Sequence, residues 1–260
     1  MKNIIFSKEE YFDKGYAVVD LLENEIVETI NFKVEELLKS GNYKENTKIY
    51  KYSDGPRIVE SWKYINEIIY IANDEIIKQA LFSLYQRNPL PFSTINFTKG
   101  SNQPLHSDYV HFGTKPDGFL CGLWIALEDI KEGSGELQVG EKTNKWPIFR
   151  YADYGLKKPT SLIEIKNNYS FYEKWVEDKI KSDNISVKNF CLKKGQALLW
   201  DFNVLHGGAV IKDKSLTRKS LVIHYHFDKT IAYNPNFSFF NGPDDIVVRD
   251  FNVIGKEENE

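Results

Sequence analysis

Short segments rich in β-branched and aromatic residues follow one another after Pro91, and they constrain the fold more than any other feature of the chain. They read FSTINFT, LHSDYVHF, FLCGLWIALE, GELQVG, GQALLWDF and RKSLVIHYHF, and clusters of Gly, Pro, Asp and Lys separate them. A series of this kind is typical of an antiparallel sandwich or barrel. We therefore expect a mainly β protein with flanking helices.

The first third of the chain is predicted to be largely helical. Ser7 followed by Glu10 forms a capping box for a short helix, and YAVVDLL then predicts a buried strand. Apolar residues at helical spacing predict an amphipathic helix over residues 24–39. A second helix is expected over residues 65–86, ending before the prolines of NPLP.

We expect one domain over residues 1–260, since this length fits a single large β fold with added helices. Its parts are helical support, the β core, an insertion with the helical sequence YSFYEKWVEDKIKS, and a carboxyl-terminal loop and tail. In chain order, the support covers residues 1–90, the core 91–230, the insertion about 148–193 and the tail 231–260.

Charge and cysteine content exclude several classes of function. The 34 basic and 37 acidic residues give a net charge of −3, and no basic stripe suggests a nucleic-acid partner. Cys121 and Cys191 fit neither a disulfide framework nor a thiolate zinc site. We find no signal peptide and no stretch near the ~20 apolar residues that span a bilayer. The expected setting is the cytoplasm and the expected partner is a small molecule, with the oligomeric state left open.

The stretch QPLHSDYVHFG brings together possible metal ligands. In a strand, alternate side chains share a face, so His106 and Asp108 would point the same way. A third ligand could come from His206 in VLHGG, behind another predicted strand. Two imidazoles and one carboxylate form the ligand set of non-haem Fe(II) oxygenases. The H-x-D tripeptide alone is a weak signal.

Arg218, twelve residues after His206, strengthens this interpretation. Arg218 and Ser220 would lie on one face of a strand, where a buried arginine is costly unless it meets an anion. The planar guanidinium suits a carboxylate, which it can bind through two hydrogen bonds. The sequence therefore predicts an acidic ligand beside the metal site.

Taken together, these motifs resemble the phytanoyl-CoA dioxygenase-like family of Fe(II)- and 2-oxoglutarate-dependent oxygenases. The resemblance rests on HSD at 106–108, LCGLWIALEDI at 120–130, GQALLWDFNVLHGG at 195–208, and Arg218 with Ser220, and it covers about residues 90–230. It implies a double-stranded β-helix, or jelly roll, of the cupin-like kind. It also implies a dioxygenase that uses Fe(II), 2-oxoglutarate and dioxygen to hydroxylate a small polar metabolite, releasing succinate and CO2.

The resemblance assigns roles to individual residues. His106, Asp108 and His206 would bind iron, and the presence of Asp108 favours hydroxylation over halogenation. The 2-oxoglutarate pocket would contain, in descending order of support, Arg218, Ser220, Trp124, Thr94, Asn96 and Gln103. Substrate contacts are expected from Arg57, Trp62, Tyr109, His111 and Asn203. The loop at 140–144 departs from the family pattern at a place that borders the substrate entrance in relatives, so the substrate is only loosely indicated as sugar-linked or derived from an amino acid.

Alternatives remain at several points. Desaturation, ring formation and acyl-CoA hydroxylation fit the same motifs, and a zinc-dependent hydrolase or isomerase or a non-catalytic binding protein would need no Arg218. His111 lies an odd number of residues from His106, so it is not expected to bind the metal if the strand is regular. His224 and His226 are interpreted as core or surface histidines, and YNPNFSFFNGP as a packed loop.

Overall fold

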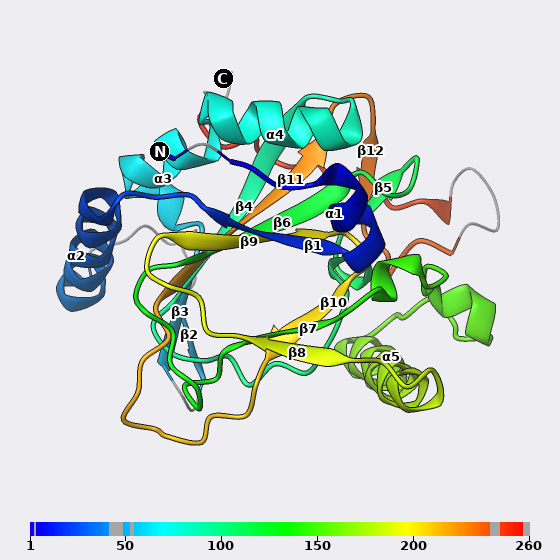
Figure 1. Cartoon of the computed structure of the whole chain (residues 1–260). Helices are drawn as coiled ribbons and strands as arrows, with labels where there is room; N and C mark the ends of the chain where they lie inside the picture. Colours follow the sequence, from blue (N-terminus) through cyan, green and yellow to red (C-terminus); the bar gives the residue numbers. More distant parts are fainter. Residues whose placement is uncertain (3, 42–48, 53–54, 240–244, 257–260) are drawn as a thin grey trace.

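The predicted strands form two antiparallel sheets that face one another, and a two-stranded ribbon lies beside them (Figure 1). The computed structural model describes residues 1–2, 4–41, 49–52, 55–239 and 245–256, with only the backbone given for 49–52. The large sheet has the order β1-β9-β6-β11-β4-β3-β2, the small sheet β10-β7-β8, and the ribbon β12-β5. The fold is therefore the jelly roll that the sequence predicts, with flanking helices.

The strands are short, as the sequence indicates. Those of the large sheet are β1 (Tyr16–Asp20), β2 (Ile49–Tyr52), β3 (Gly55–Val59), β4 (Pro89–Phe97), β6 (Leu120–Ala126), β9 (Gln196–Asp201) and β11 (Ser220–Phe227). Those of the small sheet and the ribbon are β7 (Leu137–Gly140), β8 (Val187–Phe190), β10 (Leu205–Gly208), β5 (Gly113–Lys115) and β12 (Ile231–Tyr233).

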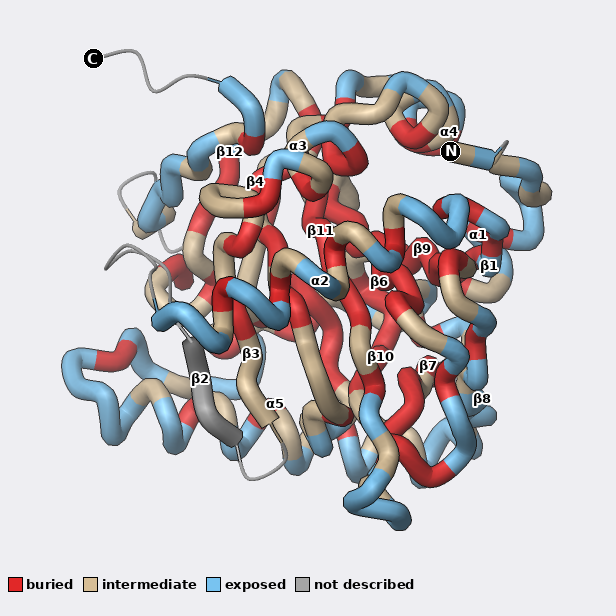
Figure 2. The backbone as a smooth tube through the Cα atoms, turned by 90° about the vertical axis from the view of Figure 1, so that its left-hand side faces the viewer, coloured by how far each residue is buried: buried red, intermediate tan, exposed pale blue. Residues whose placement is uncertain are grey.

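The large sheet has a buried core on each of its faces. Along β6, Cys121, Leu123 and Ile125 join the core beneath the helices, whereas Trp124 and Ala126 join the core between the two sheets. Successive side chains of a strand point to opposite faces. The continuous apolar run LCGLWIA is thus explained by burial on both sides, and Figure 2 shows the buried stretches concentrated in the strands.

Four helices cover the outer face of the large sheet: α1 (Lys8–Lys14), α2 (Asn24–Ser40), α3 (Asn66–Ala72) and α4 (Glu75–Tyr85). Ser7 caps α1 by accepting a hydrogen bond from the Glu10 N–H at 3.2 Å. The expectation of one helix over 65–86 is wrong, because the helix is broken at Asn73 and Asp74. The Asp74 carboxylate accepts from the Ile76 N–H at 2.8 Å and so starts α4 as a new helix.

The insertion contains the predicted helix, α5 (Leu162–Ser182), which packs beside the small sheet (Figure 1). The predicted range of 148–193 is too long, because β8 within it pairs with β7. The region after residue 230 is more than a loop and tail, since β12 pairs with β5 and Ile254 is completely buried.

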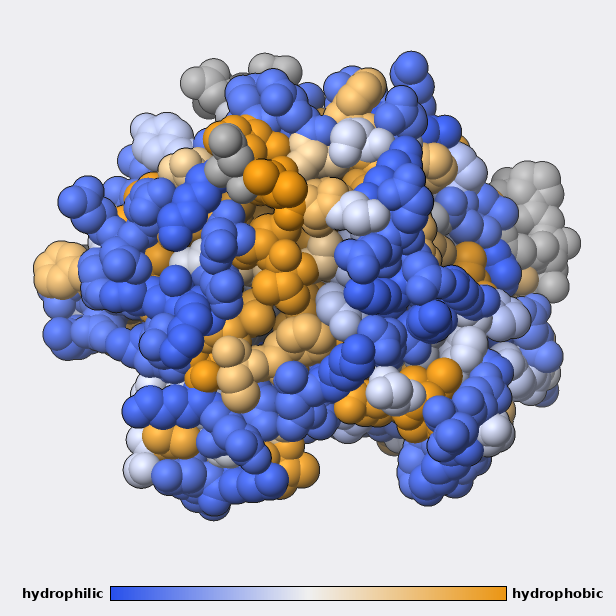
Figure 3. Space-filling view, viewed as in Figure 1, coloured by the Kyte–Doolittle hydropathy of each residue, from blue (hydrophilic) through white to orange (hydrophobic). Residues whose placement is uncertain are grey.

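The surface shown in Figure 3 is mostly hydrophilic, with hydrophobic side chains gathered in a band near its middle and in smaller patches toward its lower edge. Within the part of the chain that the structure describes, no helix combines the length and the apolar character needed to cross a membrane. Both cysteines are free thiols, Cys121 buried and Cys191 exposed.

Candidate metal centre and cavity

The segment that carries His106 and Asp108 is a loop, and the expectation of a regular strand is wrong. His106 forms an isolated bridge with His206 through two backbone hydrogen bonds, 3.0 and 2.9 Å long, and Asp108–Val110 is a 3-10 turn. The close approach depends on Gly207, where a Cβ atom would lie 2.6 Å from the Gln103 carbonyl oxygen. The bridge, not strand periodicity, brings the two histidines side by side.

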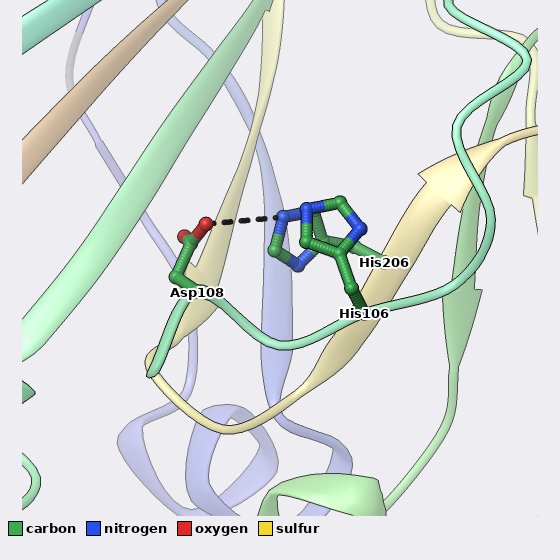
Figure 4. A group of neighbouring side chains, drawn as sticks. All are labelled: His106, Asp108 and His206. Carbon is green, nitrogen blue, oxygen red and sulfur yellow. Dashed lines mark ion pairs between the residues drawn. The ribbon is translucent and has the colours of Figure 1, made fainter. Parts of the chain in front are cut away.

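The side chains of His106, Asp108 and His206 converge, with one potential ligand atom of each lying within 4.8 Å of the others (Figure 4). All three residues are buried. His106 Nδ1 lies 2.9 Å from the Pro104 carbonyl oxygen, and His206 Nδ1 lies 3.1 Å from that of Val204. A carbonyl can only accept, so each Nδ1 donates a proton to it and Nε2 is the ring nitrogen that can bind a metal.

Asp108 is held by partners on both oxygens. Trp200 Nε1 donates to Oδ2 at 2.6 Å, His224 Nε2 lies 3.5 Å from the same oxygen, and His206 Nε2 lies 3.5 Å from Oδ1. Burial alone would raise the pKa of Asp108, but the neighbouring imidazoles His206 and His224 hold it well below its usual range. The carboxylate is therefore ionised, with Oδ1 available to a cation.

Gly122 makes room for the indole that reaches Asp108. It pairs with Trp200 across β6 and β9, and a Cβ atom at this position would lie 2.3 Å from an indole carbon.

Burial lowers the pKa of His106 well below its usual value, and His206 and His111 reinforce the shift. A neutral imidazole beside an ionised carboxylate suits a divalent metal. The three residues thus fit the iron site that the sequence predicts.

Arg218 is a buried cation without a matching anion. Only 2% of its surface is exposed, and its guanidinium carbon lies 5.0 Å from the Phe97 ring centre and 5.6 Å from that of Trp124. Burial, together with the nearby Arg57, lowers its pKa to about 10. Arg218 forms no ion pair with any residue that the structure describes, and its Nε has no hydrogen-bond partner there. Such a cation is costly without an anionic ligand.

A cavity of about 490 Å³ joins these features. It is lined by the three metal-site residues and by Arg218, Trp124, Gln103, Arg57 and His111, all singled out from the sequence. Ser220 is not among the lining residues, but it lies on the same face of β11 as Val222, which does line the cavity. The buried hydroxyl of Ser220 has no partner among the described residues. Gln103 Nε2 lies 3.1 Å from His106 Nε2.

Two expected pocket residues on β4, Thr94 and Asn96, do not line the cavity. Their neighbours Ile95 and Phe97 do, since alternate residues of a strand face opposite sides. Asn96 instead accepts a hydrogen bond from Ser61.

Three residues that were expected to contact the substrate lie away from the cavity. Trp62 packs against the core beneath the helices, and Asn203 donates to the Trp146 carbonyl at 2.8 Å. The Tyr109 hydroxyl donates to Asp117 and is hydrogen-bonded to Tyr233. None of the three lines the cavity. The loop at 140–144 is likewise absent from its lining, since it packs on α1 and β10.

His111 faces the cavity, although strand parity predicts the opposite. Its ring centre lies 5.6 Å from that of His106, because the 3-10 turn reverses the alternation. Burial lowers the pKa of His111 to about 4, so it is neutral at pH 7. It lies outside the group of three potential ligands, as expected.

Several residues that line the cavity were not anticipated. They are Phe97, Phe112, Tyr169, Trp200, His224, Asn234, Asn236 and Arg249. The interpretation of His224 as an ordinary core or surface histidine is wrong, and its even spacing from Ser220 on β11 could have placed it on the cavity face. Asn234 and Asn236 belong to the segment interpreted as a packed loop, and that segment also borders the cavity.

The family model described as "Phytanoyl-CoA dioxygenase (PhyH)" matches residues 11–219 of this chain. A curated protein from Caenorhabditis elegans, named "Probable phytanoyl-CoA dioxygenase", is 22% identical over 192 residues, which make up 72% of this chain. The match spans 56% of that relative, so the chain corresponds to little more than half of its length.

Solved structures share the fold at low sequence identity. The epimerase SnoN, in complex with Fe3+, alpha ketoglutarate and nogalamycin RO, has a TM-score of 0.67 and 16% identity, covering 96% of this chain and 94% of its own. EctD from S. alaskensis, with 2-oxoglutarate and 5-hydroxyectoine, has a TM-score of 0.69 and 15% identity, covering 95% and 84%. The carbocyclase SnoK from nogalamycin biosynthesis has a TM-score of 0.62 and 13% identity, covering 86% and 84%.

Proposed function

The chain belongs to the phytanoyl-CoA dioxygenase family, and from that membership we propose that it is an Fe(II)- and 2-oxoglutarate-dependent dioxygenase. Its reaction would hydroxylate an unactivated C–H bond of a small polar metabolite, with 2-oxoglutarate and dioxygen consumed and succinate and CO2 released. The cytoplasm is the proposed setting, in keeping with the free thiols of Cys121 and Cys191.

The observation that carries this proposal is the buried, unmatched Arg218 in the same cavity as the three metal-site residues. A zinc hydrolase would need the metal ligands but no desolvated guanidinium nearby. A dicarboxylate that binds the metal at one end would satisfy Arg218 at the other. The hydroxyl of Ser220, which is buried and has no partner among the described residues, would donate to the same carboxylate.

Each residue of the centre has a distinct task. His106, Asp108 and His206 would hold the iron, whose redox chemistry with 2-oxoglutarate and dioxygen supplies the oxidation. Trp200 and His224 hold Asp108 Oδ2, so Oδ1 is the oxygen left for the metal. Apolar and aromatic residues such as Trp124 and Phe97 line the cavity and limit the access of water.

Arg218→Ala tests the proposal. We expect the wild-type protein, loaded with Fe(II) in air, to convert 2-oxoglutarate to succinate, at least in slow uncoupled turnover. Arg218→Ala should weaken 2-oxoglutarate binding by roughly 10- to 100-fold, because a hydrogen bond to a charged group contributes about 1.5–3 kcal/mol. Isothermal titration of the Mn(II)-loaded protein under nitrogen measures this without turnover.

Arg87→Ala is the matched control, because Arg87 lies on the Phe119 ring and outside the cavity. It should leave 2-oxoglutarate affinity unchanged. If the wild-type protein binds the metal yet neither binds 2-oxoglutarate nor forms succinate, the oxygenase proposal is wrong.

A further inference from the structure

The cavity carries more positive charge than one molecule of 2-oxoglutarate requires. Arg57, Arg218 and Arg249 all line it, and Asp108 is the only carboxylate among the described residues of the lining. A divalent metal would add two further positive charges, and 2-oxoglutarate would bring two negative ones. Even with Arg57 left out of this sum, the described lining residues and the two ligands carry a net charge of +1, which favours a second anion in the same cavity.

The cations lie toward opposite ends of β4. Arg57 and Arg218 each place their guanidinium carbon 5.0 Å from the Phe97 ring centre. Arg249 instead lies against Phe112, whose ring centre is 5.2 Å from that of Phe92. Phe92 and Phe97 are five residues apart on the strand, which corresponds to roughly 16 Å. Arg218 and Arg249 thus lie beside different aromatic residues of the cavity, and because 2-oxoglutarate is assigned to Arg218, Arg249 is left for a different ligand.

The position of Arg249 is fixed by backbone hydrogen bonds. Its N–H donates to the Ala232 carbonyl at 2.9 Å, and the Asn234 N–H donates to the Val247 carbonyl at 2.9 Å. Further along, the Ile254 N–H donates to the Pro91 carbonyl at 2.8 Å. We call residues 245–256 the C-terminal arm. It is attached to the core on both sides of Arg249, so the backbone that carries this side chain is positioned before any ligand arrives.

The guanidinium of Arg249 has aromatic neighbours but no acidic one. Its carbon lies 5.0 Å from the Phe112 ring centre and 4.9 Å from that of Phe251. Among the residues that the structure describes, Arg249 forms neither an ion pair nor a side-chain hydrogen bond. It is exposed yet lines the cavity, so it lies at the opening. Partial burial lowers its pKa, and no neighbouring carboxylate counteracts that shift.

Two side-chain amides line the cavity together with Arg249. Asn234 Oδ1 accepts from the Asn236 N–H at 3.1 Å, which leaves the amide N–H groups of Asn234 for a ligand. A guanidinium with amide donors nearby can bind a carboxylate or a phosphate. A series of contacts connects this site to the metal centre: Arg249 lies on the Phe112 ring, the Phe112 ring centre is 5.5 Å from that of His224, and His224 Nε2 is 3.5 Å from Asp108 Oδ2.

We propose that the substrate of this enzyme carries a compact oxyanion, a carboxylate or a phosphate, which binds Arg249 at the opening while the carbon to be oxidised lies at the metal centre. The inference rests on the proposed function. The aromatic lining between the two sites would accommodate an apolar linker, so the anion and the reacting carbon are separated by several bonds. Arg249 lies beyond residues 11–219, so this feature lies outside the part of the chain that the family model matches.

The experiment uses matched probes, because the natural substrate is unidentified. Hexanoate and hexanamide form one pair, and hexyl phosphate and hexanol form the other. Binding is measured by NMR on the Mn(II)-loaded protein with saturating 2-oxoglutarate under nitrogen. Relaxation of each probe proton by Mn(II) reports both affinity and orientation. We expect the anionic probes to bind at least tenfold more tightly than their neutral partners, with the methyl end closer to the metal.

Variants identify the residue responsible. Arg249→Gln should weaken binding of the anionic probes by tenfold or more and leave the neutral probes unchanged, whereas Arg249→Lys should retain part of the affinity. Arg87→Gln removes the same charge outside the cavity and should have no effect. The stronger of the two anionic probes distinguishes a carboxylate-bearing from a phosphate-bearing substrate.

The inference is overturned if anionic and neutral probes bind alike, or if Arg249→Gln binds the anions as tightly as the wild-type protein does. Titration of 2-oxoglutarate without a probe separates this failure from that of the proposed function. If 2-oxoglutarate binds and depends on Arg218, only the substrate inference fails. If the metal-loaded wild-type protein does not bind 2-oxoglutarate, the proposed function fails first.

Discussion

At the scale of single residues, the environment of Asp108 decides how a metal can bind. Trp200 and His224 both approach Oδ2, whereas Oδ1 faces His206. A carboxylate with one oxygen engaged in this way offers the other as a single ligand atom. The partners of ligand side chains usually matter to metal affinity nearly as much as the ligands do.

Trp200→Phe should therefore weaken metal binding. The substitution keeps a ring but removes the Nε1 donor 2.6 Å from Asp108, and a loss of roughly 10-fold in affinity is expected. Titration with Zn(II) or Mn(II) by calorimetry measures it. Trp62→Phe is the control, because Trp62 packs beneath the helices and away from the cavity. Equal affinities in the wild-type protein and Trp200→Phe would contradict the role assigned to the indole.

Asp201 makes stability depend on pH. Burial raises its pKa to about 6, although hydrogen bonds from the Phe202 N–H and the Tyr85 hydroxyl act in the opposite direction. The unfolded chain ionises Asp201 near pH 4. The contribution of Asp201 to the free energy of unfolding is therefore fully present below about pH 4 and is lost as the pH rises through 6.

Asp201→Asn should remove that dependence. The amide oxygen can still accept from Tyr85, so the variant is expected to be more stable than the wild-type protein at pH 8, by up to about 3 kcal/mol. The difference should shrink as the pH falls toward 4. Urea unfolding at pH 4.5 and pH 8 measures the difference in the free energy of unfolding between the two proteins. The same difference at both pH values would contradict the assignment.

At the scale of elements, α5 supports the loop that carries the metal-site residues. Its Tyr172 hydroxyl accepts from the Ser107 N–H at 2.8 Å, between His106 and Asp108 in sequence. Tyr172 and Val176 also pack against Val110 and Leu205 in one buried cluster. The insertion therefore positions the site without contributing a metal ligand.

Tyr172→Phe leaves the Ser107 N–H buried without a partner. We expect the free energy of unfolding to fall by about 1–3 kcal/mol, together with a smaller loss of metal affinity. Chemical denaturation and metal titration measure the two effects. Tyr70→Phe, at an exposed position on α3, should change neither. An unchanged stability in Tyr172→Phe would show that water replaces the hydroxyl.

Sequence patterns identify most elements because periodicity reflects burial directly. The helix over 24–39 and the strands β6, β9 and β11 follow from apolar spacing alone. The loop around His106 has the β-branched and aromatic composition that is typical of strands, whereas its shape depends on the bridge to His206. The break at Asn73 and Asp74 cannot be predicted from apolar spacing, because the apolar period continues across it.

The metal site likewise has parts that the sequence predicts and parts that it does not. Its chemistry, formed by the histidines, Asp108 and Arg218, could be predicted, because those residue types have few other uses together. Which residues surround it could not be predicted reliably. The sequence does not show which face of β4 carries Thr94 and Asn96, because a shift of one residue exchanges the two faces of a strand.

At the scale of the whole molecule, the cavity and the buried Arg218 that lines it predict strong stabilisation by ligands. Metal and 2-oxoglutarate, each at a hundredfold excess over its dissociation constant, should stabilise the fold by about 2.7 kcal/mol per ligand. For a chain of this length, that corresponds to roughly 5–10 °C in Tm per ligand.

Thermal unfolding with Mn(II) alone and with Mn(II) plus 2-oxoglutarate measures the two increments. Arg218→Ala should keep the first and lose most of the second, and a chelator should abolish both. An increment from 2-oxoglutarate that survives in Arg218→Ala would show that the co-substrate binds elsewhere.

The contact between Gly122 and Trp200 has an evolutionary consequence. A side chain at position 122 would collide with the indole, and a smaller residue at position 200 would lose the donor to Asp108. The two positions should therefore vary together across homologues. Homologues with a smaller residue at position 200 should tolerate a larger residue at position 122, whereas homologues with tryptophan at position 200 should keep glycine at position 122.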